Sequence, residues 1–268
     1  MRPRRLVRPP TLHSPLAVFA PFLLAACAAT AGDRAPFPIS TDRPSVSATQ
    51  ALVPAGRTLV ESGAVVGEDG DERFRQAGEV VIRHGLSDQF ELNVGLPSYR
   101  AVEQRTVTGS AFSQETRGLT DGLFALRAAL YAPDAQSGLT PTLALLAGTT
   151  IPTGSEFGAT RALPSATLIA NWSLPRGFGF ATNVGLVAVE NGDPQPTATG
   201  VLSATVGARL GLFAEAALAR SDASWGKTLS VFGATYLLTP RLQLDLAHRR
   251  RGPASAYRDV GIGLSVAR

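Results

Sequence analysis

The chain of 268 residues has few of the side chains that crosslink proteins or bind metals: one cysteine and three histidines. A single cysteine excludes an intramolecular disulfide. The lack of Cys/His groupings at ligand spacing excludes a zinc site of the usual kind. After residue 31 there is no apolar run of about 18 residues, the length that a membrane-spanning helix needs. The sequence therefore excludes a helical membrane protein.

The first 31 residues have the layout of a secretory signal peptide. Residues 1–8 are basic without an acid, residues 16–26 form a short apolar run, and small residues follow at 28–31. A disordered Arg/Pro-rich tail is the alternative, but it gives no reason for the apolar run. Cys27 follows Leu-Ala-Ala, which resembles a lipobox and makes Cys27 a candidate for lipidation. The other interpretation is ordinary cleavage after Ala31.

Export also changes the charge balance. The whole chain has 25 basic and 21 acidic residues, a formal charge of +4. Four of the basic residues lie in the removable segment: Arg2, Arg4, Arg5 and Arg8. The mature chain therefore has 21 basic and 21 acidic residues. A neutral mature chain gives no support for a nucleic-acid partner.

Polar and apolar residues alternate from residue 57 almost to the end, with clear copies at 89–96, 241–246 and 259–266. A period of two places the apolar side chains on one face of a strand and the polar ones on the other. In a soluble sandwich the apolar face points inward, whereas in a membrane barrel it points outward to lipid. The alternation therefore predicts strands, but other features of the sequence are needed to tell which face points outward.

The lengths of the connections favour the barrel. We predict about twelve strands, at residues 57–66, 76–84, 89–97, 120–131, 140–151, 164–174, 177–189, 198–209, 210–219, 227–238, 241–249 and 257–267. Short connections alternate with longer ones, as at 98–119, which is the plan of bacterial outer-membrane barrels. Residues 123–131 and 211–219 have the composition of short helices and are assigned to strands from context.

The resulting prediction is an all-β, transmembrane, antiparallel up-and-down barrel at residues 57–268, after a short periplasmic N-terminal segment at 32–56. Its expected location is the bacterial cell outer membrane, with outer-membrane lipids and the barrel-assembly machinery as partners. Trp172, Phe178 and Tyr236 fall near strand ends, where an aromatic girdle is expected.

Lipid–lumen alternation sends most strand charges inward. The predicted lumen-lining residues are Glu61, Glu79, Arg83, Glu91, Asp121, Arg127, Glu215 and Asp245. Because buried charges need partners, we expect carboxylate–guanidinium pairs across the lumen. These pairs either brace the barrel or form a selectivity filter or solute path, and a barrel of this width permits both.

Several short motifs occur in a consistent order. They are Thr-Asp-Arg-Pro at 41–44, Val-Pro-Ala-Gly-Arg at 53–57, Gly-Leu-Ser-Asp-Gln-Phe-Glu-Leu at 85–92, Gly-Leu-Thr-Asp at 118–121, Pro-Thr-Gly at 152–154 and Gly-Ala-Thr-Tyr-Leu-Leu-Thr-Pro at 233–240. Together they resemble an outer-membrane transporter family named for the MetA pathway of phenol degradation. The resemblance covers about residues 38–268. It implies a barrel that moves small solutes, with hydrophobic or aromatic compounds as candidates.

Three functions stay open: a channel or transporter for small solutes, a closed structural or interaction barrel that uses its outer loops, and a lipid-acting enzyme. The enzyme has the least support, because only His84 and His248 follow the signal peptide and no serine sits two residues after His248. We expect no catalytic site, cofactor or metal. Asp42 and Arg43 precede Pro44, and a local turn accounts for them.

Overall fold

The computed structural model describes residues 35–268 except 105–113, 134–139, 222–223, 226–227 and 253–255. The predicted signal peptide, with Cys27, lies outside the described residues. None of the helices in the described part is long and apolar enough to cross a membrane.

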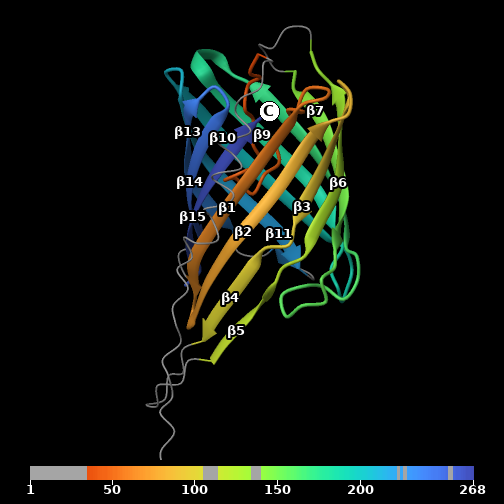
Figure 1. Cartoon of the computed structure of the whole chain (residues 1–268), viewed down its shortest axis with the longest axis vertical. Coiled ribbons are helices and arrows are strands. Elements are labelled where there is room, and N and C mark those ends of the chain that lie inside the picture. Colours follow the sequence, from red (N-terminus) through yellow and green to blue (C-terminus); the bar gives the residue numbers. More distant parts are fainter. Residues whose placement is uncertain (1–34, 105–113, 134–139, 222–223, 226–227, 253–255) are drawn as a thin grey trace, which may run out of the picture.

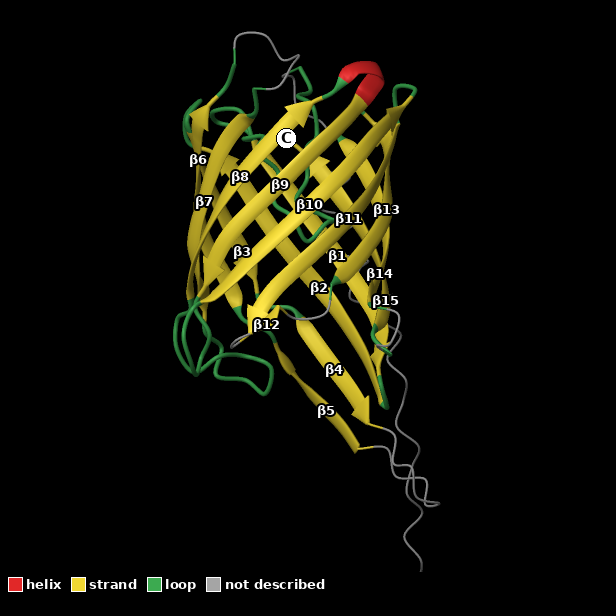
Figure 2. Ribbon diagram, turned by 180° about the vertical axis from the view of Figure 1, so that it is seen from behind, coloured by secondary structure: helices red, strands yellow, loops and turns green. Residues whose placement is uncertain are grey.

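A closed antiparallel β-barrel dominates the structure (Figures 1 and 2). Twelve of the described strands form the closed wall. They are β1 (Thr58–Asp69), β2 (Glu72–Gly85), β3 (Phe90–Leu96), β6 (Gly122–Tyr131), β7 (Thr142–Ile151), β8 (Pro164–Ser173), β9 (Phe178–Val187), β10 (Gln195–Val206), β11 (Leu210–Ser221), β13 (Leu229–Thr239), β14 (Leu242–Arg251) and β15 (Arg258–Ala267). Neighbours in sequence pair with one another, and β1 pairs with β15 to close the barrel. The predicted fold class is confirmed.

The two ends of the barrel differ. The end that carries the C-terminus has short connections, such as Pro175–Gly177, a 3-10 turn between β8 and β9 (Figure 2). We call it the short-turn end and the opposite one the long-loop end. In outer-membrane barrels the short turns face the periplasm.

One side of the wall extends beyond the rest at the long-loop end. There β4 (Tyr99–Gln104) pairs with the first half of β2, and β5 (Gln114–Leu119) pairs with β4 (Figure 1). A further two-residue strand, β12 (Ser224–Trp225), pairs with β11. The predicted strands at 57–66 and 76–84 leave a longer connection at 67–75, and another is predicted at 98–119. The first is instead a tight turn at Gly70 and Asp71, with Gly70 at a φ of 61°, and the second contains two strands. Pairing satisfies backbone groups that a long loop would leave to water.

The outer face of the wall is apolar and the inner face is polar. On β14, Leu244 and Leu246 are 41% and 52% exposed, while Gln243 and Asp245, which alternate with them, are buried inside. An apolar outer surface of this extent is stable against lipid and unfavourable in water. Residues 123–131 and 211–219, despite their helix-like composition, form β6 and β11, because barrel pairing outweighs intrinsic preference.

Residues 35–56 run through the inside of the barrel, and we call them the plug. The sequence placed residues 32–56 as a short segment on the periplasmic side. The described part instead enters from the short-turn end, crosses the lumen and returns to the same end, where Gly56 donates to the carbonyl of Gly85. At that end Phe37, Ile39 and Val53 of the plug pack with Leu59 and Ala267 in an apolar cluster. The plug thus begins and ends beside the first residues of β1.

Candidate functional site

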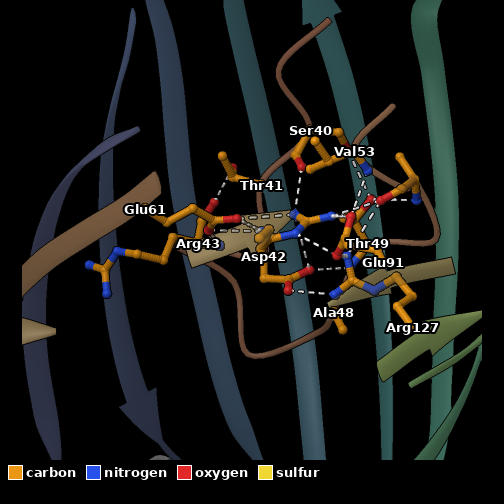
Figure 3. A network of polar contacts seen from close by, with 12 residues as sticks. Ser40, Thr41, Asp42, Arg43, Ala48, Thr49, Val53, Glu61, Glu91 and Arg127 are labelled. Carbon is orange, nitrogen blue, oxygen red and sulfur yellow. Dashed lines mark hydrogen bonds and ion pairs between the residues drawn. The ribbon is translucent and has the colours of Figure 1, made fainter. Parts of the chain in front are cut away.

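The plug is held by the inward-facing charges of the barrel (Figure 3). The two main-chain N–H groups of Asp42 and Arg43 donate to the carboxylate of Glu61 on β1, at 3.0–3.2 Å. Val53 donates its N–H to Glu91 on β3 at 2.6 Å. Both carboxylates therefore bind plug backbone as well as arginine. We call the interface between the plug and the inner wall the plug seam.

Arg83 on β2 is the centre of the plug seam. Its guanidinium donates to Glu91 at 2.9 and 3.1 Å and to Glu61 at 3.0 Å. It also donates at 2.8 Å to two plug carbonyls, those of Ser40 and Ala51. A guanidinium has five N–H donors, and these five bonds use all of them. Arg83 is fully buried, so it holds wall and plug together without contact with solvent.

Arg127 on β6 extends the seam to a carboxylate of the plug itself. It donates to Asp42 at 2.6 Å and lies 3.1 Å from Glu91. Burial disfavours the Asp42 carboxylate, but the guanidinium groups of Arg127 and Arg83 outweigh this effect and hold the pKa of Asp42 below its ordinary 3.8. Asp42 is therefore an anion in the plug at neutral pH.

The far side of the plug binds Glu215 on β11. The carboxylate of Glu215 accepts from the N–H groups of Val46 and Ser47 at 2.9 and 2.8 Å and from the hydroxyl of Ser45 at 3.0 Å. The hydroxyl of Ser47 also lies 2.5 Å from that of Thr199 on β10. The plug thus reaches across the lumen, from β1–β3 to β10–β11.

Arg43 of the plug occupies a narrow slot against β1 and β15. Its guanidinium pairs with Glu79, donates to the carbonyl of Ile262 at 3.1 Å and lies 3.9 Å from Asp245. A Cβ on Gly63 would sit 2.0 Å from its Nη2 atom, and one on Gly263 would sit 2.8 Å from its Nε atom. These glycines face each other across the β1–β15 pair. Only residues without a side chain leave room for the guanidinium here.

A cavity of about 330 Å³ adjoins the plug. Its lining comes from the plug, the inner wall and the start of β6, and includes Arg43, Ser45, Gln76, Glu79, Asp121 and Arg249. This volume lies within the range of small-molecule sites. The cavity presents both charge signs to a solute.

The structure brings seven of the eight predicted lumen residues into contact with the plug: Glu61, Glu79, Arg83, Glu91, Arg127, Glu215 and Asp245. The expected carboxylate–guanidinium pairs occur, but between neighbouring strands, with the plug as the bridge across the lumen. Asp121 instead accepts N–H groups of Thr153 and Ala159 at 3.0–3.1 Å and anchors the loop between β7 and β8.

Sequence reasoning missed several functional residues. The sequence explains Asp42 and Arg43 by a local turn, although both belong to the plug seam. Arg249 and Asp259, which pair at 2.7 Å, face inward in step with Asp245 and Gly261, so the alternation could have located them. No pattern in the sequence marks the plug, because its contacts join residues at very different separations, from 18 positions for Arg43 and Glu61 to 169 for Val46 and Glu215.

The two histidines make structural contacts. The Nδ1 atom of His84 lies 2.9 Å from the hydroxyl of Thr58, and that of His248 lies 2.9 Å from the carbonyl of Asp259. Within the described residues there is no group of three or more His, Cys, Asp or Glu residues placed to hold a metal ion. Trp172 and Phe180 contact each other at the short-turn end, and Phe178 on β9 and Tyr236 on β13 are exposed at the same end of the barrel.

Solved structures with the same fold are outer-membrane channels and porins. An outer membrane channel from Pseudomonas putida F1 superimposes with a TM-score of 0.58, covering 85% of this chain and 100% of that one, at 15% identity. The NanC porin gives 0.53 at 11% identity and covers 77% of this chain and 98% of its own. The KdgM porin gives 0.50 at 10% identity, with 78% and 98% covered. At these identities the likeness establishes the fold.

None of the curated proteins compared with the chain is significantly similar to it. The sequence pattern of one family, described as "Putative MetA-pathway of phenol degradation", matches residues 41–266. The match spans the plug from Thr41 and the whole barrel up to Val266. The chain therefore belongs to this family.

Proposed function

We propose that the chain is a bacterial outer-membrane channel for small solutes in which the plug controls passage. The plug is the observation that carries the proposal: a separate segment, tied down by polar contacts, occupies a lumen that side chains alone do not fill. Ion pairs and hydrogen bonds can exchange with water, whereas a packed apolar core cannot open in this way. The cavity beside the plug supplies the outer part of a solute path.

The polar lumen favours small polar or charged solutes over purely apolar ones. The apolar outer band is placed against outer-membrane lipid, with the short-turn end toward the periplasm. Insertion by the barrel-assembly machinery belongs to the same proposal. The proposed activity is transport and needs no catalytic group.

A closed structural barrel is the second candidate, favoured by the complete use of the Arg83 donors at the plug seam. A crosslink separates it from the channel. The hydroxyls of Ser47 and Thr199 are 2.5 Å apart, so cysteines at both positions are within bridging reach. We expect the native barrel to conduct in planar bilayers, the oxidised double variant to conduct less, and a reductant to restore the conductance.

The two single cysteine variants, Ser47→Cys and Thr199→Cys, are the matched controls and should not respond to reductant. Folding is checked by heat-modifiable migration on a gel. A folded native barrel without conductance would favour the structural barrel. Equal conductance of the oxidised and reduced double variant would show that the plug does not control passage.

A further inference from the structure

Two guanidinium groups and three aromatic rings form a row at the long-loop end. Arg251 lies 4.8 Å above the ring of Tyr257, which stacks on Phe74 with ring centres 5.9 Å apart. Arg100 lies 5.0 Å from the ring of Phe74 and 5.5 Å from that of Phe157. We call these five residues the mouth ladder. A cation over an aromatic face is held in a defined orientation.

The mouth ladder belongs to the inner face of the extended wall. Arg100 on β4 is the register partner of Gln76 on β2, and Gln76 lines the cavity beside the plug. Phe74 lies across Gly67 of β1, where a Cβ would come within 2.5 Å of its ring. The ladder therefore stands next to the cavity, on the side toward the long loops.

The charges of the mouth ladder are not neutralised by acids. Within the described residues, neither Arg100 nor Arg251 has a carboxylate within ion-pair distance or a side-chain hydrogen bond, and the Nε atom of Arg100 is buried without a partner. Neighbouring arginines do have acids: Arg249 pairs with Asp259 at 2.7 Å and Arg258 with Glu68 at 2.8 Å. The two ladder arginines thus use their faces for stacking and keep N–H edges for another acceptor.

Tyr257 adds no negative charge to the ladder. Its hydroxyl donates to Asp259 at 2.5 Å, and burial together with this bond raises the pKa of Tyr257 to about 12. The phenol is therefore neutral at physiological pH. The ladder presents aromatic surface and positive charge together.

We propose that the mouth ladder binds planar aromatic carboxylates as the first site that a solute meets before the cavity. A carboxylate can accept two parallel N–H bonds from a guanidinium edge, while the attached ring adds to the stack of rings and guanidinium planes. This inference rests on the proposed channel function and names a solute class for it. Binding and conductance are separate measurements, so either can fail alone.

The test is calorimetric titration of the detergent-folded full barrel with three probes: benzoate, cyclohexanecarboxylate and benzyl alcohol. Benzoate should bind, and the other two, which lack either the aromatic ring or the charge, should bind at least about tenfold more weakly. Arg100→Gln and Arg251→Gln should each weaken benzoate binding about tenfold. Arg100→Lys keeps the charge without the planar fork and should weaken it as well.

Arg117→Gln is the matched control. Arg117 lies on β5 on the outer side of the same wall, paired with Glu115, and its replacement should leave benzoate binding unchanged. Heat-modifiable migration checks the folding of each variant, and the exposed Arg251 supplies a usable variant if Arg100→Gln fails to fold. Equal affinity for benzoate and cyclohexanecarboxylate, equal affinity for benzyl alcohol, or unchanged binding by both glutamine variants would overturn the proposal. A barrel that binds benzoate without conducting would instead overturn the channel.

Discussion

The arginines of the plug seam and those of the mouth ladder are held in opposite ways. Arg83 is fully buried, and carboxylates and plug carbonyls accept all five of its N–H groups. Arg100 and Arg251 lie over aromatic rings and have no acid among the described residues. The first arrangement is complete within the chain, whereas the second leaves donors open. This contrast assigns retention of the plug to one region and binding of a solute to the other.

The two regions also differ in how much the loss of a contact should destabilise the fold. Buried ions that lose a partner are strongly destabilising, because the remaining charge has no solvent to replace the lost contact. An exposed cation over an aromatic ring, such as Arg251, contributes much less and can be exchanged with little effect on the fold. Changes at the mouth should therefore alter which solute binds, while changes at the seam should alter whether the barrel and plug stay together.

The largest effect is expected from Arg83→Ala. This change leaves the buried carboxylates of Glu61 and Glu91 without their central cation, so we expect a loss of about 3–5 kcal/mol in the free energy of unfolding. Urea unfolding of the barrel in lipid vesicles measures it. The comparison variant is Arg251→Ala at the mouth, with an expected change within about 0.5 kcal/mol. Similar losses in both variants would remove the distinction between the two regions.

A smaller effect is expected where a side chain enters the slot of Arg43. In Gly63→Ala the new Cβ would lie 2.0 Å from Nη2 of Arg43, so the guanidinium must leave the carbonyl of Ile262. Arg43 is long and flexible, and we expect the barrel to stay folded while the plug loosens. Displacement of the guanidinium also disturbs its pairing with Glu79. Loss of at least one hydrogen bond, about 1 kcal/mol, should raise the open fraction in bilayer recordings at least about fivefold.

Gly261→Ala is the control for this change. Gly261 is two residues from Gly263 on β15, and a Cβ there would meet its nearest atom, Nη2 of Arg249, at 3.3 Å. A similar rise in the open fraction for both variants would mean that the wall, and not the seat of Arg43, controls the plug.

The alternating pattern was enough to predict the barrel and to locate Arg83, Glu91 and Arg127 on its inner face. Side-chain direction on a strand depends on local geometry alone, so a period of two carries this information. The same pattern extends to Arg249 and Asp259, which also face inward. The strands within residues 98–119 do not follow from the sequence, because polar and apolar residues stop alternating regularly in this stretch.

The plug could not be predicted in the same way. Its contacts, such as those of Ser47 with Glu215, join residues 168 positions apart and depend on the closed barrel being present. Pro44 is enough to explain a turn at Asp42 and Arg43, so the sequence gives no reason to expect that both residues bind the barrel wall. The mouth ladder is equally non-local: Phe74, Arg100 and Tyr257 come from separate strands and loops, and only their packing makes them a row.

The smallest effect concerns pH. Arg127 and Arg83 hold the pKa of Asp42 below 3.8, so docking of the plug gains stability from the ionised carboxylate above this value and loses it as the pH falls through the lower, docked pKa. The difference in bilayer conductance between the native barrel and Asp42→Asn should therefore stay constant from about pH 8 to about pH 4 and disappear only in stronger acid. Asp42→Asn should conduct more at neutral pH. A difference that disappears between about pH 5 and pH 7 would point to a different titrating group, and the ionised Asp42 would then not be what holds the plug.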